Sequence, residues 1–488
     1  MTRRLRGAQT LRVTGLLLMT FSLSMLPPLA VSLYTDDGAV RPFLSGLWIT
    51  LVTGTALWWP VRNNRAELKL RDGFLIVVLF WSVLSAFGAI PLLYTDSGWH
   101  SYIDALFEAV SGLTTTGATV VPSGLDLLPP SLLYYRAQLH WLGGMGVIVL
   151  AVALLPMLGV GGMQLYRAET PGPMKDAKLT PRIAGTARAL WYVYLGLTLA
   201  CLLTYWALGM SLFDAVCHAM ATIATGGFST HDASFGHFNS PALEYAAMLF
   251  MLLGSFNFAV HFMAWRERNP LAYLNDSEIR ACLLIVAGFI VLISIPVLSA
   301  KLFAAPDVAI RTVAFQVISY GTTTGFATVD PSRWPLYAPL LLMLCGFMVG
   351  CAGSTAGGVK VVRLQLFVKQ ALREMHQLIH PSAAAPLKLH GKVVPDSVVF
   401  AVGGFFSVYV GATIVLSCVM MATGLSPVEA FSAVAACINN MGPGLGTLNA
   451  SMASVTDFGK CVLIFTMLLG RLEIFTLLIL FTPGFWRR

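Results

Sequence analysis

Charged residues are scarce in this sequence. Asp, Glu, Lys and Arg together make up 11% of its 488 residues, whereas a soluble domain carries about 25%. The eight cysteines lie mostly in apolar stretches, and the sequence has no C-x-x-C pair. The scarcity of charge argues against a soluble protein, and the placement of the cysteines predicts small buried residues without a disulfide.

Several enzyme motifs are also missing. The sequence contains no G-x-S-x-G, H-E-x-x-H, Walker A or G-x-G-x-x-G segment, and these segments mark hydrolases, zinc proteases, phosphate-binding loops and dinucleotide sites. We therefore expect that the chain is not an enzyme and holds no cofactor. Any control by a nucleotide would have to come through another chain.

Long apolar runs are what the sequence has instead. Apolar residues make up 57% of the chain, and the mean hydropathy is +0.75. Runs such as residues 73–93, 143–158 and 462–483 are typical of helices in a membrane. The predicted fold class is an all-α polytopic membrane protein.

The basic residues indicate the orientation of the chain. Most of the 31 Lys and Arg residues fall on one side if the N-terminus lies inside, and this excess follows the positive-inside rule. We therefore expect cytoplasmic N- and C-termini, and we expect no nucleic-acid partner despite the net charge of +8. The basic start, followed by an apolar run that reaches Tyr34, predicts a retained signal-anchor helix in preference to a cleaved signal peptide.

After two leading transmembrane helices in residues 1–72, the chain divides into four units of one plan. Each unit has an apolar span, a short helix too brief to cross, a loop with glycine and a second span. Irregular backbone at membrane depth is tolerated only where it lines a water-filled path or is buried in protein. We therefore predict pore units around a pseudo-fourfold axis, at 73–186, 187–278, 279–395 and 396–488.

The loops of the four units share a motif that recurs at intervals of roughly 100 residues. In each, an oxygen-bearing side chain stands two residues before a glycine. Glycine permits the positive φ that turns successive carbonyls the same way, and carbonyls can replace the water shell of a potassium ion. Close helix packing through small residues is the alternative, which the repetition disfavours. The predicted filter consists of Thr115, Thr116, Gly117, Thr225, Gly226, Gly227, Thr323, Thr324, Gly325, Asn440, Met441 and Gly442.

Acidic residues in the external segments have two interpretations. They can concentrate cations at the mouth of a pore, or some of them can be N-caps of the short helices, Asp214 and Glu429 especially. The sequence leaves both open for Asp104, Glu108, Asp126, Asp214, Asp232, Asp330 and Glu429.

The second span of the third unit is rich in glycine between Gly346 and Gly358. A glycine inside a helix costs about 1 kcal/mol relative to alanine, so we predict an interrupted helix, with a packing surface as the alternative. Arg471 lies deep in the last apolar run, where an ionisable residue is costly and usually functional. A buried arginine that only locks two helices is the alternative.

The chain resembles the bacterial Trk-type potassium-uptake membrane subunit, of the Trk/Ktr/HKT superfamily, over nearly its whole length. The resemblance implies that Gly117, Gly227, Gly325 and Gly442 are filter glycines. Relatives with serine at the first position tend to favour sodium, so Gly117 implies potassium; the fourth loop lacks threonine, as in the family. The matching stretches are residues 111–119, 140–146, 161–169, 226–234, 351–358, 439–446 and 470–476.

The same resemblance implies a gate, partners and a location. The glycine-rich stretch becomes an intramembrane loop that obstructs the inner half of the pore, next to Arg471. A homodimer in the bacterial inner membrane would carry a TrkA-like cytosolic ring that binds nucleotide, docked on the basic segments 160–188 and 360–392, to which anionic lipid is also attracted. Potassium at the filter would be the transported ion and the only bound metal. The implied gate residues are Gly350, Gly353, Ser354, Thr355, Gly357, Gly358 and Arg471.

A secondary transporter of another solute, or of sodium, is the alternative function, because broken helices near mid-membrane also mark such proteins. Those folds use inverted two-fold repeats, whereas four units of one orientation favour a channel-like pore. The sequence does not decide between channel-like and proton-coupled flux.

Overall fold

The computed structural model describes residues 7–64, 70–95, 99, 101–154, 183–335, 337–382, 386–389 and 392–487. Almost all regular structure in these residues is helical. The exception is a two-stranded antiparallel hairpin, β1 (Lys388–Leu389) with β2 (Lys392–Val393). The predicted all-α fold class is therefore confirmed.

The chain begins with a helical hairpin. Its helices pack closely because glycines meet at the crossing: a Cβ atom added to Gly15 would lie 2.7 Å from the carbonyl oxygen of Gly54, and small residues allow such approach between membrane helices. The hairpin consists of α1 (Ala8–Ser22), η1 (Leu23–Met25), α2 (Leu26–Thr35), α3 (Val40–Trp58) and η2 (Trp59–Val61).

Four groups of helices follow, each with a long helix, a shorter helix and then a further helical segment. The first two groups are α4 (Leu70–Leu93), α5 (Tyr102–Leu113), η3 (Leu125–Leu127) and α6 (Pro130–Leu154), then α8 (Ile183–Ala207), α9 (Leu212–Ile223), η4 (Ser234–His237), α10 (Pro241–Ser255), α11 (Phe258–Glu267) and α12 (Ala272–Asn275).

The last two groups follow the same order. They are α13 (Ser277–Ser299), α14 (Pro306–Gly321), η5 (Pro331–Arg333), α15 (Tyr337–Gly346) and α16 (Val361–Ile379), then α17 (Asp396–Ala422), α18 (Pro427–Ile438), η6 (Gly446–Leu448), α19 (Asp457–Arg471), α20 (Phe475–Leu478), η7 (Ile479–Phe481) and α21 (Pro483–Trp486). The residue boundaries of the four units stay a prediction.

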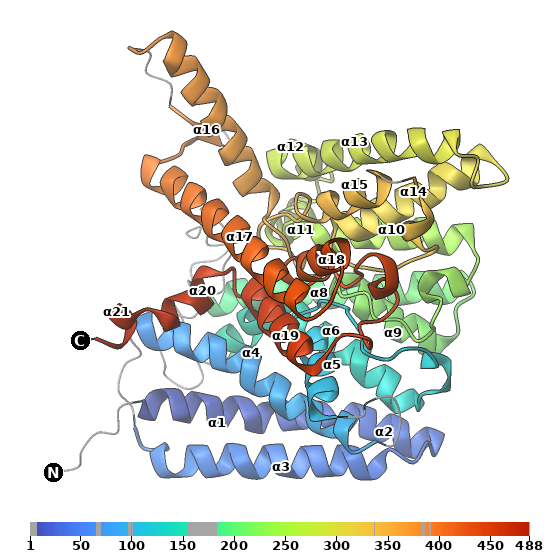
Figure 1. The fold of residues 1–488 in the computed structure, drawn as a ribbon. Coiled ribbons are helices and arrows are strands. Elements are labelled where there is room, and N and C mark those ends of the chain that lie inside the picture. The colour runs from blue at the N-terminus through green and yellow to red at the C-terminus, as the bar shows by residue number, and fades with distance from the viewer. Residues whose placement is uncertain are drawn as a thin grey trace.

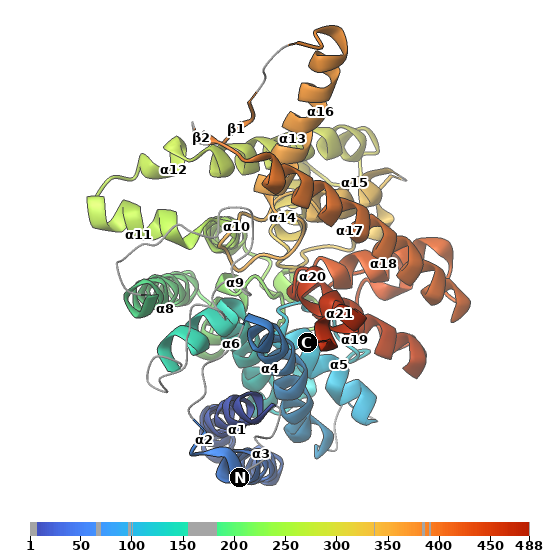
Figure 2. The same cartoon turned by 90° about the vertical axis from the view of Figure 1, so that its left-hand side faces the viewer.

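The four groups close into a ring. The helix α6 packs on α9, α10 on α14, α15 on α18, and α19 on α5, so the last group returns to the first. Figure 2 shows these helices around a common centre, with α1, α2 and α3 on the outside. In Figure 1 the start of α1, the helix α21 and the projecting α16 all lie on the left-hand side of the molecule.

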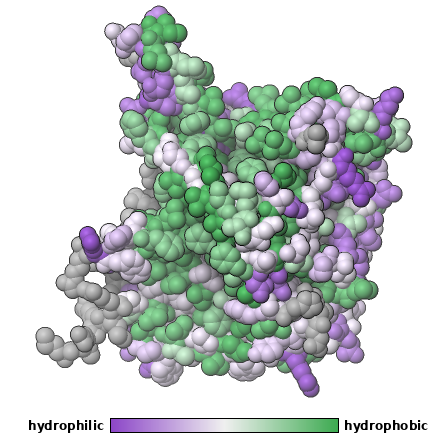
Figure 3. Space-filling view, viewed as in Figure 1, coloured by the Kyte–Doolittle hydropathy of each residue, from purple (hydrophilic) through white to green (hydrophobic). Residues whose placement is uncertain are grey.

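The described helices have the length and surface of a multi-pass membrane protein. Six are long and apolar enough to span a membrane, or eight if each of two bent pairs counts as one span. Figure 3 shows a largely apolar surface over the helices, with polar residues at the right-hand edge and on the α16 projection. Apolar side chains that face no protein partner are stable only where lipid replaces water.

The second spans are broken in more than the third group, which corrects the sequence-based expectation. In the third group α15 ends at Gly346 and α16 begins at Val361. In the second group α10 and α11 meet at 99°, because Asn257 caps a new helix by accepting a hydrogen bond from the Ala259 N–H.

The fourth and first groups are also broken. The angle between α19 and the helix that follows it is 111°, and Glu473 and Ile474 at that bend have φ values of 52° and 59°. In α6 the φ of Gly146 is 47°. Arg471 therefore ends a helix at a sharp bend, whereas the sequence placed it inside a continuous span.

Candidate functional site

The short helices α5, α9, α14 and α18 all end in the same turn. The residue after each helix cap has a positive φ, and its successor donates a 2.8 Å hydrogen bond to the carbonyl five residues before it, as Thr116 does to Ser111. This is the Schellman ending of a helix, in which glycine usually occupies the left-handed position. Here the position holds Thr115 (54°), Thr225 (51°), Thr323 (56°) and Asn440 (52°).

Left-handed backbone at a β-branched residue is costly. Such strain persists only where the surroundings enforce it, and it concentrates at functional sites. Its repetition at equivalent positions of the loops shows that the repeat seen in the sequence is also a repeat of backbone conformation. Two residues later each loop has a glycine with positive φ: Gly117 (80°), Gly227 (83°), Gly325 (84°) and Gly442 (94°).

These glycines form a closed ring, which we call the glycine ring. A Cβ atom added to Gly117 would overlap the carbonyl oxygen of Gly226, the residue before the next ring glycine. The same relation joins Gly227 to Thr324 and Gly325 to Met441. The ring closes where a Cβ atom on Gly442 would lie 2.7 Å from the carbonyl oxygen of Thr116. Glycine is required here for both its φ and the lack of space.

The glycine ring forms the floor of a cavity of about 350 Å³. Backbone and side-chain atoms of all four external loops line its walls, with Arg136, His231, Asp232 and Asp330 as the charged or titratable residues. The cavity is therefore a vestibule that leads to the backbone of the ring.

The external loops interlock around this vestibule. Each pair of neighbouring groups shares a hydrogen bond, so the loops hold one another in register. The N–H of Leu125 donates to Asp232, that of Gly236 to Ala327, that of Gly446 to Ser332, and that of Met452 to Thr119, at 2.8–3.1 Å.

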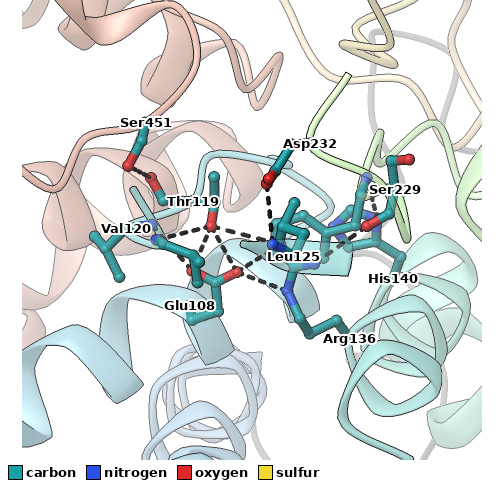
Figure 4. A network of polar contacts seen from close by, with 11 residues as sticks. Glu108, Thr119, Val120, Leu125, Arg136, His140, Ser229, Asp232 and Ser451 are labelled. Atoms are coloured by element: carbon teal, nitrogen blue, oxygen red, sulfur yellow. Dashed lines mark hydrogen bonds and ion pairs between the residues drawn. The ribbon is translucent and has the colours of Figure 1, made fainter. Parts of the chain in front are cut away.

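A buried ion pair supports two of the loops (Figure 4). Arg136 on α6 lies 2.8 Å from Glu108 on α5, and their side chains are 1% and 0% exposed. Glu108 accepts hydrogen bonds from the Thr119 hydroxyl and the Val120 N–H, just after Gly117. The Arg136 guanidinium lies 4.0 Å above the ring of Phe228, just after Gly227.

The sequence analysis missed this pair, because it treated Glu108 only as one of several external acids. An arginine within an otherwise apolar helix is a signal that could have identified it, because charges at membrane depth pair with one another. His140, one turn along α6, stacks on the same Phe228 ring with centroids 4.1 Å apart.

The interpretation of Asp214 and Glu429 as N-caps is wrong by three residues. Ser211 and Ser426 are the N-caps of α9 and α18, and Asp214 and Glu429 stand at the third helical position. Ser426 and Glu429 form a capping box, in which each side chain accepts from the backbone N–H of the other. The hydrogen bonds from Thr447, and then from Ser426, lower the pKa of Glu429 below its ordinary value of 4.5.

Beneath the glycine ring lies the Gly-rich loop, residues 347–360 between α15 and α16. The Thr355 hydroxyl donates to the carbonyls of Ile223 and Gly254 at 2.9 and 3.0 Å, and it lies 3.3 Å from the Thr225 hydroxyl. The Gly357 N–H donates to the Thr323 hydroxyl at 2.7 Å. The loop is therefore joined to the strained residues of the second and third turns.

The other predicted gate residues in the loop allow it to pass close to neighbouring backbone. A Cβ atom on Gly357 would overlap the carbonyl oxygen of Asn439, and one on Gly350 would lie 2.7 Å from that of Gly357. Gly353 and Gly358 have φ values of 69° and 73°. Ser354 donates a hydrogen bond within the loop, to the Cys351 carbonyl at 2.6 Å.

Arg471 reaches the same place from α19. Its guanidinium donates to the Thr355 carbonyl at 3.2 Å and to the Thr115 hydroxyl at 3.3 Å. It also donates to the carbonyl of Gly143 on α6 at 2.5 Å. A fixed positive charge thus lies between the Gly-rich loop and the strained turn of the first group.

Comparison with known proteins places this arrangement in a family. The family model described as TrkH, a cation transport protein, matches residues 40–487. The chain belongs to the TrkH family. The resemblance found in the sequence is therefore confirmed, and the family is one of cation transport proteins.

Individual relatives match over nearly their whole length. The Trk system potassium uptake protein TrkH of Halomonas elongata is 51% identical over 478 residues, covering 98% of this chain and 99% of the relative. The protein of that name from Escherichia coli K12 is 48% identical over 476 residues, with 98% of both chains covered. TrkG of the same strain is 42% identical over 473 residues, with 97% of each covered.

A solved structure shares the fold. The crystal structure of the potassium transporter TrkH from Vibrio parahaemolyticus matches with a TM-score of 0.89 and 47% sequence identity, covering 98% of this chain and 99% of that one.

Proposed function

We propose that this chain takes up potassium across the inner membrane of a bacterium through the glycine ring. The observation that carries the proposal is the closure of that ring: each of four glycines faces the backbone carbonyl of the next loop. Rings of carbonyls at a constriction are the means by which channels replace the hydration shell of potassium. The names of the relatives, potassium uptake proteins, support the choice of ion.

The ends of the short helices strengthen cation binding. All four end at the ring, and the C-terminal end of a helix carries partial negative charge. The Gly-rich loop contacts the side-chain oxygens of Thr225 and Thr323, and Arg471 donates to that of Thr115. We infer that these oxygens, with that of Asn440, lie on the inner side of the ring. We infer that Thr116, Gly226, Thr324 and Met441 contribute through their backbone carbonyls.

The Gly-rich loop and Arg471 act as the gate in this proposal. Their hydrogen bonds join the loop to the inner side of the filter, and a guanidinium there repels a cation that leaves the ring. Opening requires Thr355 of the loop to break its hydrogen bonds with Ile223 on α9 and Gly254 on α10. The alternative for Arg471 is a static lock that holds α19 against α6. In that case, removing the contact between Arg471 and the loop would leave the flux unchanged.

The membrane potential is sufficient to drive uptake. It supplies about 2.3 kcal/mol per unit charge for each 100 mV, so the transport step itself needs no ATP. The proposed gate lies on one side of the filter. The basic helix α16 lies on the same side of the molecule as α21 (Figure 1). Both support cytoplasmic termini.

A homodimer with a cytosolic TrkA-like ring completes the proposal. The helix α16 projects from the body (Figure 1) and exposes apolar side chains, with Leu372 56% and Leu378 83% exposed. Lys369 and Arg373 lie on the same helix, and anionic lipid would compete for them. Residues 160–182 of the other proposed docking segment, 160–188, lie outside the described residues, and α8 begins at Ile183.

A flux assay in liposomes tests the function. Purified protein would be reconstituted and given an imposed potential, with and without a pH gradient. We expect potassium flux that follows the potential; a requirement for the pH gradient would indicate proton coupling. Sodium flux equal to that of potassium, or no ion flux from protein of verified fold, would contradict the proposal and favour a transporter of another solute.

A further inference from the structure

Three potential metal ligands meet at the rim of the vestibule. Asp126 belongs to η3 in the first group, and His231 and His237 belong to the external loop of the second. One ligand atom from each lies within 4.8 Å of the others. Because the residues come from two loops far apart in sequence, no spacing motif reveals them.

The three side chains already lie close together. Nδ1 of His231 is hydrogen-bonded to a carboxylate oxygen of Asp126. The rings of His231 and His237 are stacked, with centroids 3.5 Å apart and an angle of 2° between their planes. The nitrogen lone pair of an imidazole lies in the plane of its ring, so metal binding requires the exposed His237 ring to turn out of this stack while its ligand atom stays within reach of the other two.

A second carboxylate, Asp214, lies close to the other ring nitrogen of His231. Nε2 of His231 lies 3.4 Å from Asp214 Oδ1, and that oxygen accepts a 2.7 Å hydrogen bond from Thr230. The other Asp214 oxygen accepts from Ser211 at 2.7 Å. Histidines that bind a metal through one nitrogen typically donate the other to a carboxylate, which fixes the ring.

The donor set selects the kind of metal. Two imidazoles and one carboxylate suit Zn²⁺, Ni²⁺ or Cu²⁺, whereas potassium, Mg²⁺ and Ca²⁺ prefer oxygen alone. Three protein ligands leave a fourth position for water. Asp126 and His237 are exposed, so an ion can enter from the external solution.

A metal ion at this position would affect cations that enter the vestibule. His231 and its neighbour Asp232 line the vestibule, and Asp232 holds the N–H groups of Gly124 and Leu125, next to Asp126. A divalent ion here would join the first and second loops and place two positive charges at the entrance, where a like charge lowers the local concentration of cations.

We propose that Asp126, His231 and His237 form an external site for a divalent transition metal, with Zn²⁺ as the reference ion, and that its occupancy slows cation entry. Asp214 is a positioning residue of this site. The effect on entry rests on the proposed function, whereas metal binding does not.

Direct binding to the purified full-length protein tests the site without any flux measurement. Zn²⁺ would be titrated by calorimetry in a non-chelating buffer, and thermal stability would be followed in parallel. We expect one equivalent to bind, a loss of affinity of at least about 10-fold in His237→Ala, and a loss of about 10-fold in Asp214→Asn. His376→Ala, on the cytoplasmic helix α16, is the matched control and should bind as the unmodified protein does.

Equal Zn²⁺ affinity in His237→Ala, Asp126→Asn and the unmodified protein would overturn the site. Flux in liposomes then tests the effect: external Zn²⁺ should slow potassium flux, a chelator should restore it, and His237→Ala should not respond. Binding at the predicted residues without any change in an active flux would overturn the inhibition. If no potassium flux is found at all, the proposed function fails, while the binding titration still decides the metal site.

Discussion

The guanidinium of Arg471 donates a hydrogen bond of 3.2 Å to the backbone carbonyl of Thr355. This contact joins the last long helix to the Gly-rich loop, directly beneath a turn that holds Thr115. Arg471 therefore binds the loop directly, and the position of its charge is coupled to the position of the loop.

Replacing Arg471 with alanine should raise the resting potassium flux, because it removes both a positive barrier and an anchor of the Gly-rich loop. Deleting residues 353–357 should have the same direction of effect. Ion flux in liposomes at equal protein abundance is the measurement, and Arg333→Ala is the control, since that arginine is 86% exposed on the external side. Unchanged flux in both variants, with normal folding, would leave Arg471 as a static lock.

Replacing Gly117 with serine should lower the preference for potassium over sodium. The new side chain would overlap the Gly226 carbonyl, and its φ of 80° is unfavourable for serine. Gly227, Gly325 and Gly442 should lose conduction on the same change. Gly288→Ser on α13 is the control, because no atom lies within 4 Å of a Cβ atom there. Equal permeability ratios in the ring variants and this control would refute the filter assignment.

Replacing Glu108 with glutamine should destabilise the protein, because it leaves the Arg136 charge buried without its partner. Breaking a buried pair in this way costs about 3–5 kcal/mol. The double variant Glu108→Gln with Arg136→Gln should recover part of the loss. Thermal unfolding in detergent measures both, and a double variant that is less stable than the sum of the single changes would show that the pair does not act as a unit.

The capping box of α18 should make stability depend on pH in one direction. The pKa of Glu429 is lower in the folded protein than its ordinary value of 4.5. Its charged form therefore stabilises the fold above pH 4.5, and this contribution is lost as the pH falls through the lower folded value. Thermal unfolding of the unmodified protein and Glu429→Gln, compared from roughly pH 6 to pH 3, should converge at the acidic end. A difference that grows with acidity would contradict the prediction.

Charge reversal of Lys369 should weaken binding of a cytosolic nucleotide-binding ring and its effect on flux together. Lys369 is preferable to Arg363 for this test, because Arg363 pairs with Glu473 at 2.5 Å and its reversal would disturb the bend after α19. Pull-down and flux with the purified ring are the measurements. Saturable ATP binding to the isolated chain, or nucleotide control of flux without a partner, would sink this prediction.

The sequence was sufficient to predict the repeated loops and the helix whose glycine content makes a continuous helix costly. Glycines at matched offsets predicted four equivalent loops, and the glycine content before Gly358 predicted a broken helix. It was not sufficient for the bend at Asn257, where a single capping side chain starts a new helix, because nothing in the apolar pattern distinguishes that asparagine from a buried polar residue.

Contacts between distant segments were also out of reach. Glu108 and Arg136 stand on different helices, and Asp126 and His231 on different loops, so their meeting depends on the closure of the helix ring. Without that closure the sequence left Glu108 as one of several external acids. The structure makes it half of a buried pair that supports the loops.

The glycine ring has no first or last member. At every seam a ring glycine faces a backbone carbonyl oxygen of its neighbour, and that contact does not depend on the side chain before each glycine, so Met441 can stand where another loop has Thr116. A bulky residue at any ring glycine, however, must displace an oxygen supplied by its neighbour. Four unequal copies can therefore diverge in chemistry on their outer and inner sides while remaining bound to one shared backbone geometry.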